Sequence, residues 1–268
     1  MKIKKKINHV INDLKTRKFK ILINRLYREF LRIIFKFQSS KNKVRILDEN
    51  WDNLIILDTC RYDFFKKNYE KYLDGKLERK KSLGSSTREW LIKNFNKKTD
   101  IMYVSANPHL NNANIKNQSW NFNFYKIIEA WDDEWDDKIN SVHPARLVKL
   151  ANKLDKNYPN KRKIIHFIQP HLPYLTKSKE FNKYIYKKQT TVDLSKKDIS
   201  EMKKGYEENL KIVLKELNKL KLRGKTIITS DHGECFGEYG LLLHHDGIYI
   251  KSLIEVPWFI FNKRKATN

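Results

Sequence analysis

Four short, almost wholly apolar runs recur along the chain, and polar side chains follow each of them. The runs span residues 53–57, 101–105, 163–168 and 225–229. Apolar runs of this length, without alternation, are typical of strands buried on both faces of a parallel sheet. Two further segments, residues 144–156 and 198–222, have apolar side chains at helical spacing. The pattern therefore predicts an α/β domain with a mostly parallel central sheet and helices on both faces.

Each predicted strand ends in side chains that can bind a metal or an anion. Asp58 closes the first run, Asn107 and His171 follow the second and third, and Ser230-Asp231-His232-Gly233-Glu234 follows the last. Carboxylates and imidazoles bind catalytic divalent metals, and open α/β sheets bind ligands at the carboxyl ends of their strands. One active site explains all four strand ends together. His166, inside the third run, is predicted to be a satisfied interior residue.

Five sequence blocks, taken in order, resemble the motifs of the sulfatase branch of the alkaline phosphatase superfamily. They are Leu57–Asp63, Gly84–Leu91, Gln169–Tyr174, Ser230–Glu234 and His244–Gly247. The resemblance covers about residues 50 to 261, and its most specific parts are the Asp-His-Gly-Glu and Pro-His-x-Pro-Tyr blocks. It implies an alkaline phosphatase-like three-layer sandwich. It also implies a metal-dependent enzyme that attacks phosphate or sulfate esters with a hydroxyl nucleophile.

The resemblance also implies a metal site. The positions that match metal ligands of the family are Asp58, Thr87, Asp231 and His232. Mixed oxygen and nitrogen donors leave the ion open, so Mn²⁺, Zn²⁺, Mg²⁺ and Ca²⁺ all remain candidates. We expect one tightly held metal rather than two, because Gln169 stands where a second site would need a carboxylate.

Thr87 best matches the nucleophile, because Ser85-Ser86-Thr87 resembles the loop that opens a helix at this place in the family. Such a helix start also offers unpaired backbone N–H groups to an anionic ester. Ser85 and Ser86 remain rivals for this role. Alternatively, they cap a helix that begins near Arg88, with Glu89 near the capping-box position.

By the same resemblance, His171 and His244 bind the transferred group, act as general acids, or bind a second metal. The remaining candidates for substrate binding are Ser86, Asn107, Arg61 and His245. Arg61 either neutralises substrate charge or pairs with Asp63. His245 is either a site residue or the exposed neighbour of His244.

Phosphorus chemistry is favoured over sulfur chemistry. Type I sulfatases carry a Cys or Ser followed by x-Pro-x-Arg, and this chain has no such sequence, while Cys60 and Cys235 lie in other motifs. Two other classes of protein compete with an enzyme. One is a catalytically idle relative that binds membranes or anionic glycans. The other is a basic nucleic-acid-binding protein, which is not expected because no reader fold is recognisable.

Positive charge is concentrated at the N-terminus. The chain has 56 Lys and Arg against 31 Asp and Glu, and residues 1–45 hold fifteen of these cations but only Asp13 and Glu29 as acids. Within this arm, residues 19–37 have a cationic stripe on an otherwise apolar helix. This pattern is typical of a helix in a membrane interface, although a helix packed on the sheet domain fits it as well.

We therefore expect a basic helical arm over residues 1–45, whose residues 1–40 attach peripherally to a membrane, and a catalytic domain over residues 46–268. Two cysteines, no evident cleavable signal peptide and no apolar run of 18 residues favour a cytoplasmic protein, at the inner face of the membrane if the arm binds there. The segments 107–140 and 174–197 are expected to set specificity, with residues 177–188 as a loop.

Overall fold

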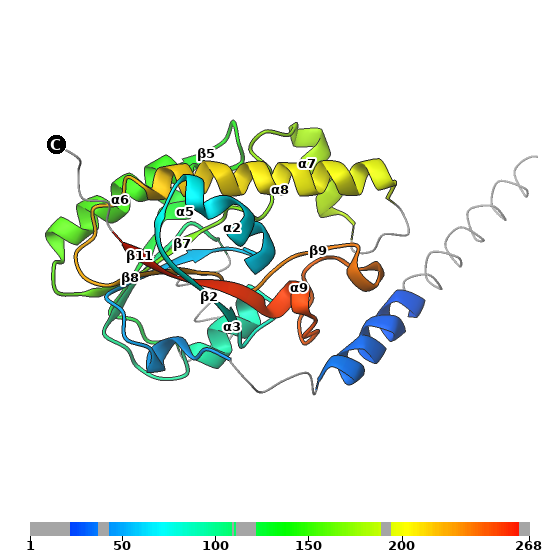
Figure 1. The fold of residues 1–268 in the computed structure, drawn as a ribbon, viewed down its shortest axis with the longest axis horizontal. Helices are drawn as coiled ribbons and strands as arrows, with labels where there is room; N and C mark the ends of the chain where they lie inside the picture. The colour runs from blue at the N-terminus through cyan, green and yellow to red at the C-terminus, as the bar shows by residue number, and fades with distance from the viewer. Residues whose placement is uncertain (1–21, 37–42, 109, 111–121, 189–193, 263–268) are drawn as a thin grey trace, which may run out of the picture.

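A seven-stranded sheet forms the centre of the computed structural model, which describes residues 22–36, 43–108, 110, 122–188 and 194–262 (Figure 1). Its strands are β1 (Asn53–Leu57), β2 (Asp74–Lys81), β3 (Ile101–Ser105), β4 (Lys126–Glu129), β7 (Arg162–Phe167), β8 (Thr226–Thr229) and β11 (Glu255–Asn262). The spatial order is β2-β11-β8-β1-β7-β3-β4. The five strands from β8 to β4 run parallel, so their carboxyl ends meet at one edge. The mostly parallel sheet predicted from the sequence is confirmed.

Helices cover both faces of this sheet. They are α2 (Tyr62–Asn68), α3 (Thr87–Asn94), α5 (Ala130–Asp133), α6 (Pro144–Asn157), α7 (Lys179–Tyr186), α8 (Lys196–Leu217) and α9 (Lys251–Ile254). In Figure 1, α6 and α8 cross above the sheet and α3 lies below it. The described residues also form short 3₁₀ helices and strands: η1 (Ile46–Asp48), η2 (Tyr69–Lys71), η4 (Glu238–Gly240), β5 (Trp135–Asp136), β6 (Ser141–Val142), β9 (Cys235–Phe236) and β10 (Leu242–Leu243).

Strand β1 shows why its apolar run has no polar alternation. Ile55 and Leu57 point into the core beneath α6 and α8, whereas Leu54 and Ile56 point into the core shared with Trp90 of α3. Successive side chains of a strand point to opposite faces, so a strand covered on both sides is apolar at every position. All five residues of β1 are buried.

The antiparallel edge of the sheet was not evident in the sequence. β11 pairs antiparallel with both β8 and β2. β2 consists mostly of charged residues, with three Lys, and is only partly buried. Charged side chains suit an edge strand, because they discourage pairing with another chain.

The expectation of a loop over residues 177–188 is wrong for most of that segment, because α7 forms there. Ser178 caps this helix by accepting a hydrogen bond from the backbone N–H of Phe181. Phe181 and Ile185, one turn apart, pack against Tyr174 and Met202. Residues 189–193, which belong to the same expected specificity segment, lie outside the described residues, as do 109 and 111–121 of the other.

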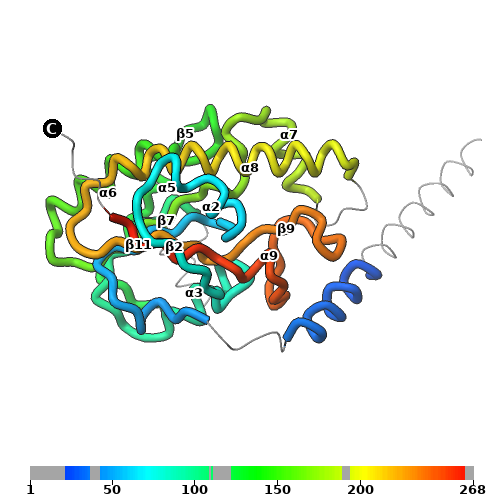
Figure 2. The backbone as a smooth tube through the Cα atoms, in the orientation of Figure 1, coloured from blue at the N-terminus to red at the C-terminus, as the bar shows by residue number. Residues whose placement is uncertain are grey.

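Residues 22–35 of the N-terminal arm form a helix. Leu31 and Phe35 of this helix are buried against the segment that follows β8. Figure 2 shows the helix, in dark blue, beside the orange loop that carries β9. The Tyr27 hydroxyl and Arg32 Nε donate hydrogen bonds to backbone carbonyls of that loop, at Tyr239 and Asp246. Residues 1–21 and 37–42 of the arm lie outside the described residues, and none of the described helices is long and apolar enough to span a bilayer.

Candidate active site

Two carboxylates and an imidazole meet at the carboxyl edge of the sheet. Asp58 follows β1, while Asp231 and His232 follow β8, and these two strands are parallel neighbours. His232 Nε2 lies 3.3 Å from Asp231 Oδ2 and 3.8 Å from Asp58 Oδ1. All three side chains are buried, and one ligand atom from each lies within 4.8 Å of the others. The register of two strands therefore assembles a donor set from positions more than 170 residues apart.

Each carboxylate accepts hydrogen bonds through one of its oxygens, while its other oxygen has no partner among the described residues. Asp58 Oδ2 accepts a hydrogen bond from Asn107 Nδ2 at 2.6 Å. Asp231 Oδ1 accepts from the backbone N–H groups of Thr59 and His232, at 3.2 and 3.0 Å. Within the described part of the chain, Asp58 Oδ1 and Asp231 Oδ2 have no hydrogen-bond partner. Unpaired buried carboxylate oxygens are costly, so this arrangement fits a bound cation.

His232 is oriented in the same way. Its Nδ1 lies 2.8 Å from the carbonyl oxygen of Gly233 and donates its proton there, which leaves the lone pair of Nε2 facing the two carboxylates. Burial lowers the pKa of His232, even though the charge of Asp231 opposes this shift. The ring is thus neutral, as a metal ligand must be. Thr87 Oγ1 lies 3.2 Å from Nε2 and completes the set.

His166 lies closer to this centre than the sequence indicates. Its Nδ1 is 2.8 Å from the Tyr103 hydroxyl. Its Nε2 faces Asp58 Oδ2 at 3.6 Å and Asp231 Oδ2 at 3.9 Å, without a hydrogen-bond partner in the described residues. Burial raises the pKa of Asp58, but His166 and the other histidines outweigh it, so the pKa of Asp58 is lowered overall. Asp58 therefore stays ionised.

The two serines beside Thr87 are occupied by local structure. Ser86 is the N-cap of α3, and its Oγ accepts from the backbone N–H of Glu89. Ser85 Oγ lies 2.9 Å from both a Glu89 carboxylate oxygen and the carbonyl oxygen of His245. Thr87, in contrast, directs its hydroxyl at His232. Of the three hydroxyls, the one on Thr87 faces the cluster of Asp58, Asp231 and His232.

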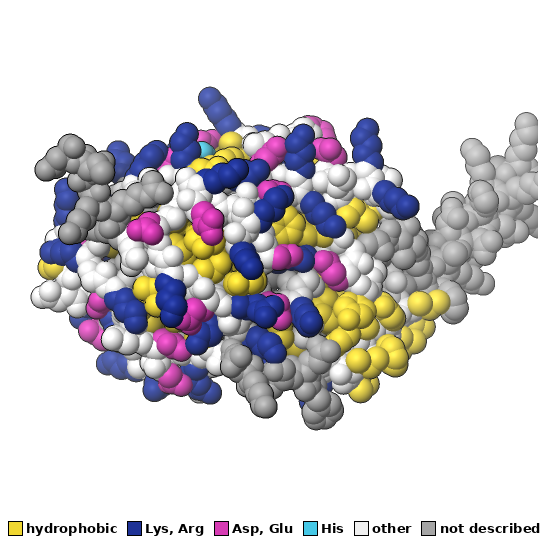
Figure 3. Space-filling model, viewed as in Figure 1, with side chains coloured by type: hydrophobic (Ala, Val, Ile, Leu, Met, Phe, Trp, Pro, Cys, Tyr) yellow, Lys and Arg dark blue, Asp and Glu magenta, His cyan; other side chains and the backbone are white. Residues whose placement is uncertain are grey.

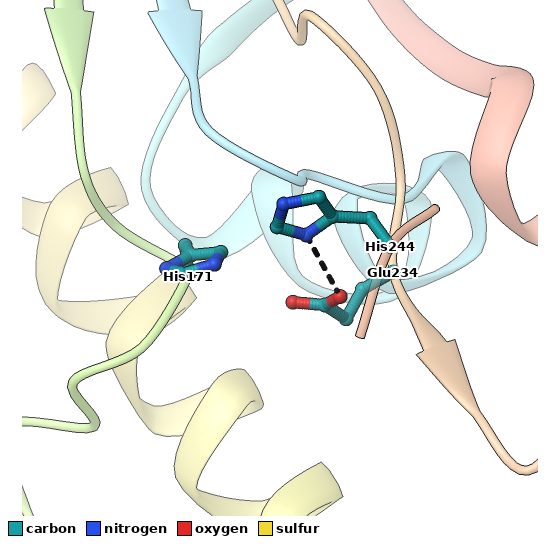
Figure 4. Close-up of side chains that lie close together, drawn as sticks. All are labelled: His171, Glu234 and His244. Carbon is teal, nitrogen blue, oxygen red and sulfur yellow. Dashed lines mark ion pairs between the residues drawn. The ribbon is translucent and has the colours of Figure 1, made fainter. Parts of the chain in front are cut away.

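A second cluster adjoins the first and consists of His171, Glu234 and His244 (Figure 4). Leu243 of β10 pairs with Cys235 of β9, and this antiparallel register places His244 opposite Glu234. Glu234 is fully buried and has no hydrogen-bond partner on either carboxylate oxygen among the described residues. His244 Nδ1 lies 3.5 Å from Glu234 Oε1.

The charge of His244 follows from this contact. Burial lowers the pKa of His244, but Glu234 and the nearby aspartates raise it to about 9 overall. His244 is therefore protonated at neutral pH when no cation occupies the cluster. Its ring lies 4.5 Å from that of His232 and 5.2 Å from that of His171, measured between centroids. The two clusters thus form one continuous site.

Gln169 lies apart from both clusters. Its Nε2 donates to Ser141 Oγ and to the carbonyl of Val142, at 3.1 and 3.2 Å. The carboxylate beside the histidines comes from Glu234 instead, a residue of the Asp-His-Gly-Glu block. The expectation of one metal rather than two remains a prediction.

Arg61 lies away from the cavity that contains Thr87. Its guanidinium pairs with Asp63 at 2.7 Å and with Glu238 at 2.6 Å. Burial lowers the pKa of Arg61, but these two carboxylates raise it above its ordinary value. This geometry matches the ion-pair alternative. His245, in contrast, lines the cavity.

The site opens into a cavity of about 710 Å³. The sequence-predicted residues that line it are Asp58, Thr87, Asn107, His171, His244 and His245. The other walls come from residues 135–140, from the loop after His171 and from α7. A cavity of this volume is suited to an organic ligand of substantial size rather than to a phosphate group alone.

No family model matches this chain, and no curated protein matches it in sequence. Solved structures do match. The C-terminal periplasmic domain of EcEptC from Escherichia coli, in complex with Zn, has a TM-score of 0.52 and 12% identity, covering 81% of this chain and 75% of that chain. The soluble domain of lipooligosaccharide phosphoethanolamine transferase A from Neisseria meningitidis has a TM-score of 0.45 and 14% identity, covering 79% and 76%. A protein in the alkaline phosphatase superfamily from Vibrio parahaemolyticus has a TM-score of 0.47 and 10% identity, covering 90% and 70%.

At these identities the likeness concerns the fold. The similarity to the EcEptC domain shows that this chain shares the fold of that domain, with a mostly parallel sheet between two layers of helices. The fold implied by the sequence motifs is confirmed.

Proposed function

We propose that this protein is a metal-dependent phosphoester hydrolase or transferase that uses the Thr87 hydroxyl as its nucleophile. One observation carries the proposal. Two buried carboxylate oxygens without a hydrogen-bond partner among the described residues, on Asp58 and Asp231, converge with His232 Nε2, which contacts the Thr87 hydroxyl. The solved Zn complex of the EcEptC domain supports zinc among the four candidate ions. One of the similar structures, from N. meningitidis, is named as a phosphoethanolamine transferase, and such a transfer is a reaction of the proposed kind.

A divalent ion held by these ligands would lower the pKa of the attacking hydroxyl and neutralise charge on the ester oxygens. Thr87 Oγ forms a bond to phosphorus as the bond to the leaving oxygen breaks. The first turn of α3 presents backbone N–H groups and the positive end of the helix dipole beside the same point. A water or a second alcohol then attacks the phosphothreonine and releases Thr87.

The leaving oxygen needs a proton, and His244 is suited to supply it. Glu234 holds His244 in its protonated form near neutral pH, and His244 lines the cavity. His171 Nδ1 lies 2.6 Å from the carbonyl oxygen of Leu172 and donates to it, so His171 directs Nε2 away from that bond. The two histidines would bind the transferred group from the side opposite Thr87 or protonate the leaving oxygen.

The cysteines argue against sulfatase chemistry of the formylglycine type. Both are buried, and burial raises the pKa of the Cys60 and Cys235 thiols. Neither is a thiolate at neutral pH, and neither lines the cavity. A hydroxyl nucleophile, which is the arrangement of phosphoester chemistry, therefore remains our proposal.

The N-terminal helix supports attachment at an anionic membrane, and we propose the cytoplasmic face on the sequence alone. Leu26, Phe30 and Ile33 are 60%, 57% and 68% exposed, and they belong to a larger hydrophobic patch on residues 22–34 (Figure 3). Arg25 and Arg28 flank this patch. Apolar burial and cationic attraction add together at an anionic lipid surface, with roughly 1 kcal/mol from each basic residue. The substrate would then be lipid-linked or made at the membrane.

The proposal is tested by measuring turnover of an aryl phosphate, an aryl phosphodiester and an aryl sulfate by the full chain. Thr87→Ala should lose several orders of magnitude of activity, because a covalent step is removed. Ser86→Ala is the matched control and should lose only the stability of a helix cap, about 1 kcal/mol. Equal activity in Thr87→Ala and loss in Ser86→Ala would move the nucleophile by one residue. A folded protein that turns over none of the three esters would support the idle alternative.

A further inference from the structure

The cavity continues well beyond the catalytic groups, along one face of α7. Lys179, Asn182, Lys183 and Tyr186 all line it. Their spacing of three, four and seven residues places them on a single helical face. Phe181 and Ile185 lie on the opposite face and pack into the core. The cavity wall is therefore a continuous polar and aromatic surface of this helix.

This face is held at a defined position relative to the catalytic loop. Asn182 Oδ1 accepts a hydrogen bond from the backbone N–H of Tyr174 at 2.8 Å, and Asn182 Nδ2 donates to the Tyr174 carbonyl at 3.0 Å. Tyr174 ends the block that carries His171. At the other end, Lys179 Nζ donates to the carbonyl of Asp137 at 2.9 Å, which joins α7 to the segment carrying Trp135.

The charge of this region is one-sided. Asp58 is the only acidic residue lining the described cavity, and it belongs to the metal cluster. Lys183 is exposed and has no hydrogen bond or ion pair with the described residues, whereas Lys177, just before α7, pairs with Glu201. The cavity that Lys183 lines also includes Trp135 and Tyr186, the latter 64% exposed. An exposed aromatic ring and an unpaired ammonium group in one cavity provide stacking and charge recognition together.

We propose that this face of α7 forms a second binding subsite, for an anionic group on the part of the substrate remote from the reacting phosphorus. The inference rests on the proposed function, because the reacting ester is placed at Thr87. From there the body of the substrate follows the apolar wall past Trp135 and Tyr186, and its second anion meets Lys183. The substrate class is thus an organic phosphoester with an apolar or ring-shaped body and a further phosphate or carboxylate.

The test compares Lys183→Glu with Lys187→Glu. Lys187 is also exposed and follows one turn later, but it does not line the cavity, so the second variant makes the same change of charge outside the subsite. The probes are two 4-nitrophenyl phosphodiesters whose other ester group is a butyl chain or a chain ending in a carboxylate. The wild type and Lys187→Glu should prefer the carboxylate substrate in kcat/KM. Lys183→Glu should lose about tenfold of that preference, the equivalent of one charge-assisted contact. Equal preference in both variants overturns the subsite.

A binding measurement separates this inference from the proposed function and identifies where the anion comes from. Affinity for glucose 6-phosphate, with glucose as its control, is measured by calorimetry for both variants. Binding to phosphatidylglycerol vesicles, with phosphatidylcholine as control, is measured in parallel. A loss of affinity that occurs only in Lys183→Glu supports the subsite, even if no phosphodiester is turned over. A loss for glucose 6-phosphate assigns the anion to a soluble source, and a loss for the vesicles assigns it to a lipid. Identical affinities of the two variants for both probes contradict it.

Discussion

Removal of the hydroxyl of Tyr206 should lower both the stability of the fold and the metal affinity of the site, although Tyr206 is not one of the proposed metal ligands. Tyr206 comes from α8 and is completely buried. Its hydroxyl donates to the carbonyl of Thr59 at 2.7 Å and accepts from the backbone N–H of Arg61 at 2.8 Å. Thr59 has a φ of 62°, a left-handed conformation that a β-branched residue adopts only when its surroundings enforce it. Tyr206 therefore holds the strained turn that directly follows Asp58.

The magnitude follows from the two hydrogen bonds. At about 0.5 to 1.5 kcal/mol each, their loss in Tyr206→Phe lowers the free energy of unfolding by about 2 kcal/mol. For a chain of this size, that corresponds to a fall in Tm of about 4 to 8 °C. Relaxation of Thr59 also disturbs its hydrogen bond to Asp231 Oδ1. Metal affinity should then fall by about tenfold or more, as is typical when a group supporting a metal ligand is lost.

Tyr174→Phe is the matched control. Tyr174 is also buried, at 1% exposure, but its hydroxyl has no hydrogen-bond partner among the described residues. Its removal should leave Tm and metal affinity unchanged or slightly improved. Scanning calorimetry and metal titration on both variants decide the matter. A Tyr206→Phe variant as stable and as metal-retentive as Tyr174→Phe would refute the role of Tyr206.

Three further predictions concern other parts of the molecule. Gly233→Ala should unfold several degrees below the wild type in scanning calorimetry, because a Cβ at Gly233 would collide with the backbone carbonyl of Ser252; an unchanged Tm would show that the loop can shift freely. Gly205→Ala should also destabilise the fold, because its Cβ would come within 2.7 Å of the Tyr174 ring. This clash should outweigh the preference for Ala over Gly inside a helix, about 1 kcal/mol. A gain in Tm would contradict this packing. Serine at Leu26, Phe30 and Ile33 together should reduce salt-sensitive binding to anionic vesicles in a flotation assay while Tm stays unchanged, since these side chains are exposed. Unaltered flotation would count against membrane attachment by this helix.

The parallel strands were predictable because burial on both faces removes every polar residue from them. β1 and β3 have the predicted bounds, β7 is shifted by one residue at both ends, and β8 begins one residue later than predicted. α6 and α8 were also evident, since their apolar residues recur at helical spacing. In contrast, β2 and β11 form an antiparallel edge, and the charged composition of β2 hides its strand character. α7 has only eight residues and buries only Ile185 fully, which is too little periodicity to indicate a helix.

The cluster of Asp58, Asp231 and His232 could be anticipated from the sequence, because these residues directly follow parallel strands and such strand ends meet at one edge. The contact between Glu234 and His244 could not, since it depends on the pairing of β9 with β10. The position of His166 also depends on tertiary structure. His166 lies inside β7, whereas its neighbours Asp58 and Asp231 follow the ends of β1 and β8.

The most direct test of the account is the metal content of the purified full chain and of Asp231→Asn, measured by elemental analysis. The substitution keeps the shape of the side chain but removes the charge from Oδ2, which faces His232 Nε2 and has no hydrogen-bond partner in the part of the chain that the structure describes. The wild type should carry a divalent ion, and the variant should lose that ion together with its phosphoesterase activity while remaining folded. A folded Asp231→Asn protein that retains the full metal content of the wild type would contradict the proposed centre.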